Sequence, residues 1–506
     1  MAEYAMRGGG RLTLAPTEAL LREGGDTRLA LDPVSGCNRY GCSARPELGV
    51  ALFGSATAST ISPGGFVAAD ALRERLAVAE GREPRSAVYA RELDRVRGEL
   101  IELCGLGGLA GLEVVFAASG TDLHLLAAEM VAGPVGAPTL CIDIEPEETG
   151  SGVPAALGGR HFSGWSALGS PVTEGAAIGP GGTEIAALSA RAADGSLRDG
   201  AEIEAELDAL VLAASRAGRK VLLEVTDVSK TGLISPGLDV VLAVTRRFPG
   251  VVEVLIDACQ FRLSPASLRA YLEHGFMVAV TGSKFLAGPT FSAALLVPAP
   301  AAERLRGRLP RPGLRPYSAR AEWPADWVAR GALSDAANYG LLLRWEAALS
   351  ELRAFRALAE ADVELFVARF AGAIEARLAD DPIFTPLPGR EPDRSAIGAG
   401  GGWDRIPTIF PFLLRHTEGP HEGWLSLAAT QDVYRGLMGA PTPVRLGQPV
   451  RCGARGGRPI SALRLCNSAR LVVEGVADGK AVIARALAAL DAVGDAARAM
   501  SRSGRV

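Results

Sequence analysis

This 506-residue chain has very little lysine and no long apolar run. Lysine stands at only four positions, 220, 230, 284 and 480, and all the other members of its 53 basic residues are arginine. No apolar run reaches the length needed to cross a membrane. The start, MAEYAMRGGGRL, has no apolar stretch behind its cationic residues. We therefore expect neither a membrane span nor a signal peptide.

Patterns typical of disulfides, metal sites and nucleic-acid surfaces are also missing. The seven cysteines are scattered, with no CxxC pair and no Cys/His ligand spacing, so we expect no metal site. An odd number of thiols without an export signal predicts reduced cysteines and a cytoplasmic location. Arginine is balanced by acid throughout, and the net charge of -4 argues against binding to nucleic acid.

The pattern of apolar residues divides the chain into three parts. We expect an irregular, Gly/Ser/Thr-rich N-terminal arm in residues 1–80, a large domain in 81–330, and a connecting helix with a smaller α+β domain in 331–506. In the large domain, apolar strands alternate with amphipathic helices. This alternation predicts an α/β fold with a doubly wound, mainly parallel sheet. A long helical stretch is expected from 332 to 378, and the Pro/Gly-rich stretch 386–402 is long enough to cover a site.

The most informative stretch is residues 251–298. One apolar run ends at Asp257 and a second leads to Lys284, with an amphipathic segment between them, so we expect strand, helix, strand. The acid and the lysine then lie at equivalent strand ends, where open α/β sheets bind ligands. Pyridoxal phosphate (PLP) needs this pair: a lysine forms its Schiff base, and an acid keeps its pyridine nitrogen protonated.

The scarcity of lysine limits where such a cofactor could attach. Arginine cannot form a Schiff base because its guanidinium stays protonated. Lys220 and Lys480 are expected at the surface, in a strand start and a charged helix. Lys230 also follows an apolar strand and is the alternative candidate for the Schiff base. It can also be interpreted as a loop cation near the site. We assign the Schiff base to Lys284.

An anion site is expected upstream of these residues. A predicted strand, 112–116, and a predicted helix, 123–130, are joined by a turn that contains Ser119, Gly120 and Thr121. Small residues at such a turn expose backbone N–H groups, and the helix N-terminus adds partial positive charge. The two hydroxyls can add donors. The same residues are common helix N-caps, so the turn alone is weak evidence for a phosphate site.

Together these motifs resemble the fold type I PLP enzymes of the aminotransferase superfamily. The closest likeness is to the class V branch, with the cysteine desulfurases and kynureninase. The motifs read Asp257-x-x-Gln260, Thr281-x-Ser283-Lys284 and Gly288-Pro289. The residue before the lysine is a serine here and a histidine in the family. Its hydroxyl can bind a phosphate oxygen, but it cannot act as a proton carrier.

The resemblance implies further contacts to cofactor and substrate. Near the ring hydroxyl, Ser229 or Lys230 takes the place of the family's asparagine. Arg464 corresponds to the late arginine that grips the substrate carboxylate, a task that suits a guanidinium; pairing with a protein acid is the other interpretation. The ring-stacking residue is expected within 147–152, where no aromatic residue or histidine stands. His124 is expected to be packed or exposed and not catalytic.

The resemblance also implies a homodimer with the active site at the interface. Thr290, or the stretch 55–60, is the candidate donor of a phosphate ligand to the neighbouring subunit. The first functional hypothesis is a PLP aminotransferase acting on an amino acid. The second is a PLP lyase, replacement or carbon–carbon bond-forming enzyme, and the third is a non-catalytic α/β binding protein. A desulfurase would need a cysteine on a mobile loop, for which Cys452 is the one candidate.

Overall fold

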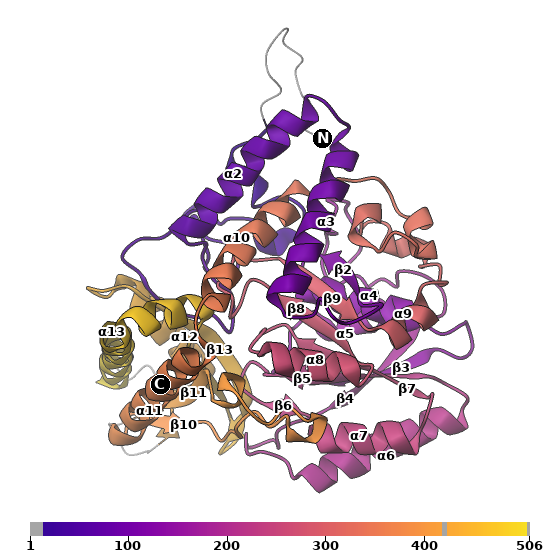
Figure 1. Ribbon diagram of the computed structural model, residues 1–506. Coiled ribbons are helices and arrows are strands. Elements are labelled where there is room, and N and C mark those ends of the chain that lie inside the picture. The colour runs from indigo at the N-terminus through magenta and orange to yellow at the C-terminus, as the bar shows by residue number, and fades with distance from the viewer. Residues whose placement is uncertain (1–13, 417–422, 503–506) are drawn as a thin grey trace.

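The computed structural model describes residues 14–416 and 423–502, which form a large and a small sheet with their helices (Figure 1). The large sheet has the strand order β2 (Glu113–Ala117), β9 (Ala293–Val297), β8 (Met277–Thr281), β7 (Val252–Ala258), β5 (Val221–Asp227), β3 (Thr139–Ile144) and β4 (Thr183–Leu188). Only β9 runs antiparallel to its neighbours in this order, and the short β6 (Ile234–Ser235) pairs antiparallel with β5. The expected α/β fold with a mainly parallel sheet is confirmed.

The strands of the large sheet are apolar on both faces because helices cover both sides. In β2, Val114 and Phe116 belong to one core cluster, while Val115 and Ala117 belong to the other. Successive side chains of a strand point to opposite faces, so each strand supplies both cores. A sheet buried on both faces therefore appears in the sequence as continuous apolar runs, which is the pattern that predicted it.

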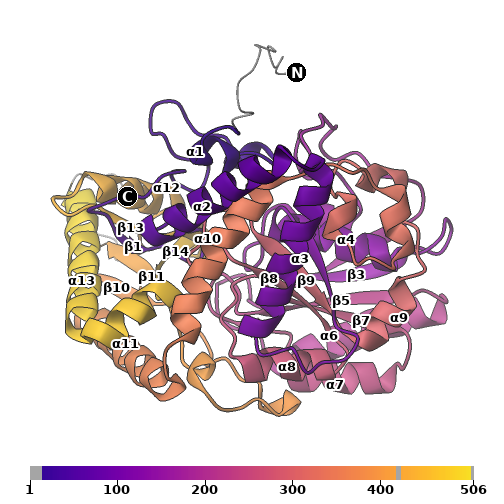
Figure 2. The ribbon, with the colours of Figure 1, turned by 45° about the horizontal axis from the view of Figure 1, so that its top comes forward.

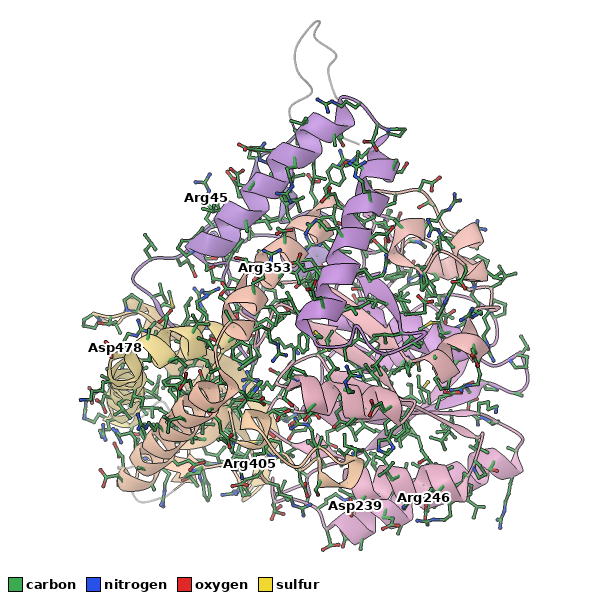
Figure 3. The ribbon with its side chains drawn as sticks, viewed as in Figure 1. Arg45, Asp239, Arg246, Arg353, Arg405 and Asp478 are labelled. Carbon is green, nitrogen blue, oxygen red and sulfur yellow. The ribbon has the colours of Figure 1, made fainter. Side chains whose placement is uncertain are left out.

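Two sets of helices pack on the two faces. One face is covered by α4 (Gly120–Val131), α5 (Val153–Leu157) and α9 (Ala299–Leu305). The other is covered by α3 (Arg85–Leu103), α6 (Gly200–Arg216), α7 (Leu238–Arg247) and α8 (Pro265–Glu273). In α7, Val241 and Val244 are buried, while Asp239 and Arg246 are exposed and lie on its outer side (Figure 3). This one-sided apolar stripe is what holds a surface helix against a sheet.

The small sheet has the strand order β1 (Ala51–Phe53), β13 (Val444–Arg455), β14 (Arg458–Cys466), β11 (Ile409–His416) and β10 (Phe384–Pro386), with β12 (Gly423–Trp424) paired to β11. Figure 2 shows α11 (Glu360–Asp380) and α13 (Ala469–Arg502) on the side of this sheet that faces away from the large one. This unit also contains α12 (Leu427–Gly436). The first strand comes from the N-terminal segment and pairs parallel with β13, so that segment is built into the small sheet.

Two sequence expectations about helices need correction. The N-terminal arm is not irregular to residue 80, because 63–80 form α2 (Pro63–Glu80), which buries Leu72 and Leu76. Its start, Pro-Gly-Gly, resembles a turn, but the N-cap hydroxyl of Ser62 accepts a hydrogen bond from Gly65 N–H and starts the helix. The expected long helical stretch is two helices, α10 (Tyr339–Arg356) and α11.

A short helix, α1 (Thr17–Leu20), precedes α2, and residues 1–13 lie outside the described part of the chain. Among the described residues, no helix combines the length and apolar character that a membrane crossing requires.

Candidate functional site

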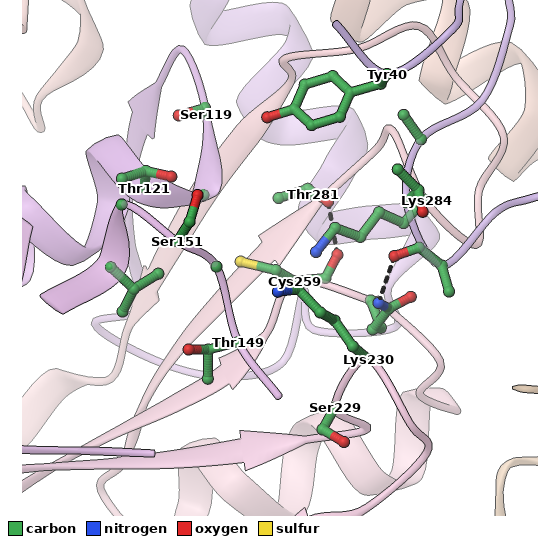
Figure 4. Close-up of a pocket in the computed structure, with 18 of the residues that line it drawn as sticks. Tyr40, Ser119, Thr121, Thr149, Ser151, Ser229, Lys230, Cys259, Thr281 and Lys284 are labelled. Atoms are coloured by element: carbon green, nitrogen blue, oxygen red, sulfur yellow. Dashed lines mark hydrogen bonds between the residues drawn. The ribbon is translucent and has the colours of Figure 1, made fainter. Parts of the chain in front are cut away.

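A cavity of about 540 Å³ opens at the carboxyl ends of β5, β7 and β8 (Figure 4). The residues that the sequence assigned to the cofactor and the substrate all line it: Ser119, Gly120, Thr121, Ser229, Asp257, Gln260, Thr281, Ser283, Lys284, Thr290 and Arg464. The remaining walls come from the N-terminal segment, from the stretch 146–153 and from β13. The volume lies in the range of cavities that bind cofactors and small molecules.

Two lysine side chains enter the cavity. Figure 4 shows Lys230 and Lys284 extending toward the same region from separate loops. The ammonium of Lys230 donates a hydrogen bond to Pro146 O at 2.8 Å. Burial, and then the charges of Arg464 and Lys284, lower the pKa of Lys230 to about 8. Within the described part of the chain, no atom accepts a hydrogen bond from the Lys284 amine. Lys220 and Lys480 are exposed, as expected.

Asp257 faces the cavity with a buried histidine beside it. Its Oδ1 accepts a hydrogen bond from Cys259 N–H at 3.0 Å, and its Oδ2 lies 3.5 Å from His124 Nε2. Burial alone would raise the pKa of Asp257, but His124 and Lys284 lower it below its ordinary value. Burial lowers the pKa of His124, while Asp257 and Glu224 together raise it well above its ordinary value. Asp257 is therefore a carboxylate held against an imidazolium.

The histidine also lies beside Glu224, and a further buried acid, Asp143, neighbours Glu224. The Nε2 of His124 lies 3.6 Å from Glu224 Oε1, and ligand atoms of His124, Glu224 and Asp257 all lie within 4.8 Å of one another. Burial and the neighbouring Glu224 raise the pKa of Asp143 to about 10, so this carboxyl is protonated at neutral pH. The positive imidazolium of His124 and the neutral, protonated carboxyl of Asp143 together reduce the net negative charge of this buried cluster.

The turn between β2 and α4 has the form expected of an anion site, but the carboxylate of Asp122 already accepts hydrogen bonds from it. Ser119 caps α4, and Asp122 completes a capping box by accepting from Ser119 N–H at 2.9 Å. Burial and Asp26 raise the pKa of Asp122 to about 6. A Cβ on Gly120 would lie 2.8 Å from Cys259 Sγ, so a glycine is required there.

Sequence reasoning missed the residues that the N-terminal segment brings to this turn. Arg28 donates to Thr121 Oγ1 at 3.0 Å and to Ser119 Oγ at 3.1 Å. Tyr40 also lines the cavity and lies between Ser119 and Lys284 in the view of Figure 4. Nothing marks Arg28 among the many arginines of the sequence, because its contact depends on how the segment folds back.

Arg464 is buried in β14 without an acidic partner. It donates to Thr57 Oγ1 at 2.8 Å, to Gln448 O at 2.6 Å and to Lys230 O at 3.3 Å, while its Nε has no partner. Among the described residues, no carboxylate lies within ion-pair distance of it. The interpretation that it pairs with a protein acid is therefore wrong. A buried guanidinium held only by neutral oxygens is suited to bind an anionic ligand.

Two other expectations about the site also need correction. Cys452 lies buried in β13, where its Sγ contacts Ile460 O, and it does not line the cavity. The stretch 386–402 does not cover the cavity either. Its Arg394 is anchored away from the cavity by a buried ion pair with Asp227 at 2.5 Å, in which the carboxylate balances the charge of the guanidinium.

Comparison with known proteins identifies the fold of the chain and not its function. No protein-family model and no curated protein sequence matches the chain. Among solved structures, a mutant of C-DES with glycine covalently linked to the PLP cofactor matches with a TM-score of 0.54 and 16% identity over 87% of this chain and 96% of that one. The cystine C–S lyase C-DES in complex with cysteine persulfide matches with a TM-score of 0.53 and 16% identity, covering 86% and 97% of the two chains.

A NifS-like protein from Rickettsia africae matches with a TM-score of 0.50 and 12% identity, covering 88% of this chain and 99% of that one. At such low identity these likenesses show the fold alone. The chain has the architecture of the fold type I PLP enzymes.

Proposed function

We propose that the cavity binds PLP through a Schiff base on Lys284, and that the protein is an enzyme acting on an amino acid. One observation carries this proposal. Lys284, the ionised Asp257 and the Ser119–Thr121 turn converge on one cavity, in a fold that PLP enzymes use. An amine, a carboxylate and an anion-binding turn are the three groups that the cofactor requires.

The residues of the cavity fit the cofactor. Asp257 would hold the pyridine nitrogen, and its charge is secured by His124. The phosphate would contact the N-terminus of α4, with hydroxyls from two further cavity residues, Ser283 and Thr290. Ser229, Gln260 and Thr281 would surround the ring. When bound, PLP withdraws electrons from the α-carbon of the amino-acid substrate, and the protein groups select which bond breaks.

Arg464 would bind the substrate's α-carboxylate. Its guanidinium is buried and faces the cavity, and none of the acids in residues 14–416 and 423–502 compensates its charge. A bidentate ion pair with a carboxylate would supply that compensation and orient the substrate.

Amino-group transfer is the first candidate reaction. The second is lyase or replacement chemistry, which is favoured by the likeness to C-DES, described as a cystine C–S lyase. Carbon–carbon bond formation belongs to the same class of alternatives, and a non-catalytic binding protein is the third possibility. We further propose a homodimer in the cytoplasm as the working form.

The deciding experiment compares two lysine variants after incubation with PLP. We expect Lys284→Ala to abolish the visible absorption band of the lysine-bound cofactor and Lys230→Ala to keep it. The reverse result would move the attachment to Lys230, and absence of the band in the wild type would refute the cofactor assignment.

A panel of amino acids then separates the reactions. Accumulation of an α-keto acid that depends on an amino acceptor indicates transfer, whereas release of a β-substituent indicates lyase chemistry. A stable band with no product for any amino acid would favour the binding protein.

A further inference from the structure

We propose that Arg28 is a phosphate ligand of the cofactor, so that the N-terminal segment of the same chain completes the phosphate site. This inference rests on the proposed PLP function. It concerns a residue that sequence analysis did not single out, and it gives the N-terminal segment a definite task.

The guanidinium of Arg28 is fixed in position at the turn that begins α4. Its Nε and one NH2 nitrogen contact Asp26, the latter at 2.6 Å, and this contact fixes one edge of the guanidinium plane. The rings of Phe162 and Phe291 lie 5.5 and 4.7 Å from its central carbon. Held by a carboxylate and by two aromatic rings, the group loses little further entropy when it binds an anion.

The same guanidinium already contacts both hydroxyls of the turn that begins α4. It donates to Thr121 Oγ1 at 3.0 Å and to Ser119 Oγ at 3.1 Å, and both residues line the cavity together with Arg28. An anion that contacts either hydroxyl therefore lies within reach of the guanidinium. Arginine forms short, charge-assisted hydrogen bonds to phosphate oxygens, which makes it the appropriate residue for this position.

The charges of the turn explain why a cation is needed. Asp122 accepts from both the N–H and the Oγ–H of Ser119, so two donors of the turn are already used. Asp26 adds a second buried acid nearby. A helix N-terminus next to two acids is a poor site for a dianion unless a fixed cation offsets them. Within the described part of the chain, Arg28 is the cation that contacts this turn.

The segment that carries Arg28 is attached to the cavity at a second point. Asn38 donates to Thr290 Oγ1 at 3.1 Å, and Thr290 lines the cavity of its own chain. The N-terminal segment therefore contacts cavity residues of its own chain at two points, the turn before α4 and Thr290.

The test compares the affinities of the apoprotein for PLP and for pyridoxal, which lacks the phosphate, by titrating the visible absorption band. We expect Arg28→Met to weaken PLP binding about 10- to 100-fold, the usual value of a charge-assisted hydrogen bond, and to change pyridoxal binding less than about threefold. Arg45→Met is the matched control. Arg45 lies on the same segment, is exposed, pairs with Glu18 and does not line the cavity, so both affinities should stay within about threefold.

Inorganic phosphate provides a second measurement on the wild type: it should compete with PLP and not with pyridoxal. Arg28→Lys keeps the charge and serves if the methionine variant does not fold; it should lose part of the preference for PLP. Equal loss of PLP and pyridoxal in the Arg28 variants, or no loss, would overturn the assignment. A wild type that binds neither compound would instead refute the proposed function.

Discussion

At the residue scale, the charge of Asp257 depends on its buried neighbour. The imidazolium of His124 lies 3.5 Å from the carboxylate and keeps its pKa low despite burial. Asp257→Asn preserves the shape and removes the charge. We expect PLP to remain bound in part and turnover of the best amino acid in the panel to fall about 10²- to 10³-fold, because electrostatic stabilisation is a large catalytic contribution. Unchanged turnover would show that this acid is not the pyridinium partner.

The sequence could predict Asp257 and Lys284 as site residues, but it could not predict His124 as the neighbour of Asp257. The first two follow apolar runs, and the ends of parallel strands meet at one sheet edge whatever the details of packing. The position of His124 depends on how α4 is rotated against the sheet. Its Nδ1–H donates a hydrogen bond to Gly120 O at 2.7 Å, and this contact directs Nε2 toward Asp257 and Glu224. No periodicity in the sequence specifies that contact.

Asp122 should make the stability of the apoprotein depend on pH. Burial raises its pKa to about 6 from the ordinary value of 3.8. The folded state therefore holds this proton more tightly than the unfolded state, and the resulting stability is lost as the pH rises from about 4 to about 6. Asp122→Asn should remove this dependence and raise the free energy of unfolding at pH 7 by about 1–3 kcal/mol.

Urea unfolding at pH 4.5 and pH 7 measures both effects. The side-chain oxygen of asparagine can still accept the hydrogen bond from the backbone N–H of the N-cap residue, so loss of the capping box should change the free energy of unfolding little. The same pH dependence in wild type and variant would contradict the raised pKa.

At the element scale, the loop between β10 and β11 is a structural anchor. Arg394 of this loop pairs with Asp227 at the end of β5, and Tyr271 donates a further hydrogen bond to the same carboxylate. The side chains of the ion pair are at most 1% exposed. Composition alone suggested a mobile cover, since a Pro/Gly-rich stretch looks the same whether it is free or anchored. The buried ion pair of Arg394 with Asp227 shows that this stretch is anchored.

Removal of one partner of this pair should be costly, because an uncompensated buried charge remains. We expect Arg394→Met to lower the free energy of unfolding by about 3–5 kcal/mol. Glu204→Gln is the control, since Glu204 pairs with Arg247 at the exposed surface of the neighbouring helices and should cost less than about 1 kcal/mol. Denaturant unfolding of both variants gives the comparison. Equal small losses would mean that the loop is held by packing and not by the ion pair.

At the scale of the whole molecule, the N-terminal segment joins the two sheets. It supplies β1 to the small sheet, Arg28 to the turn before α4, and Ala56, Thr57 and Ala58 to the cavity wall. The sequence indicated only an arm near the site, because each of these contacts is made with a residue far along the chain. Such long-range contacts leave no local pattern.

This segment also provides the basis for expecting a dimer. Within its residues 31–50, two apolar side chains, Val34 and Leu48, are 94% and 83% exposed. Exposed apolar groups grouped on one segment are typical of a surface that a partner covers, and a two-fold pair is the commonest soluble oligomer. We expect light scattering of the PLP-loaded protein to give the mass of a homodimer.

The charged double variant Val34→Asp with Leu48→Asp tests this surface and the cofactor site separately. The two substitutions should shift the protein toward the monomer, since a charge cannot be buried in an apolar contact without a partner. If Arg28 completes the phosphate site within one chain, this monomer should still bind PLP within about tenfold of the wild type. Loss of PLP together with the dimer would mean that the neighbouring subunit supplies a ligand. A wild type that is a monomer with full activity would exclude a shared site altogether.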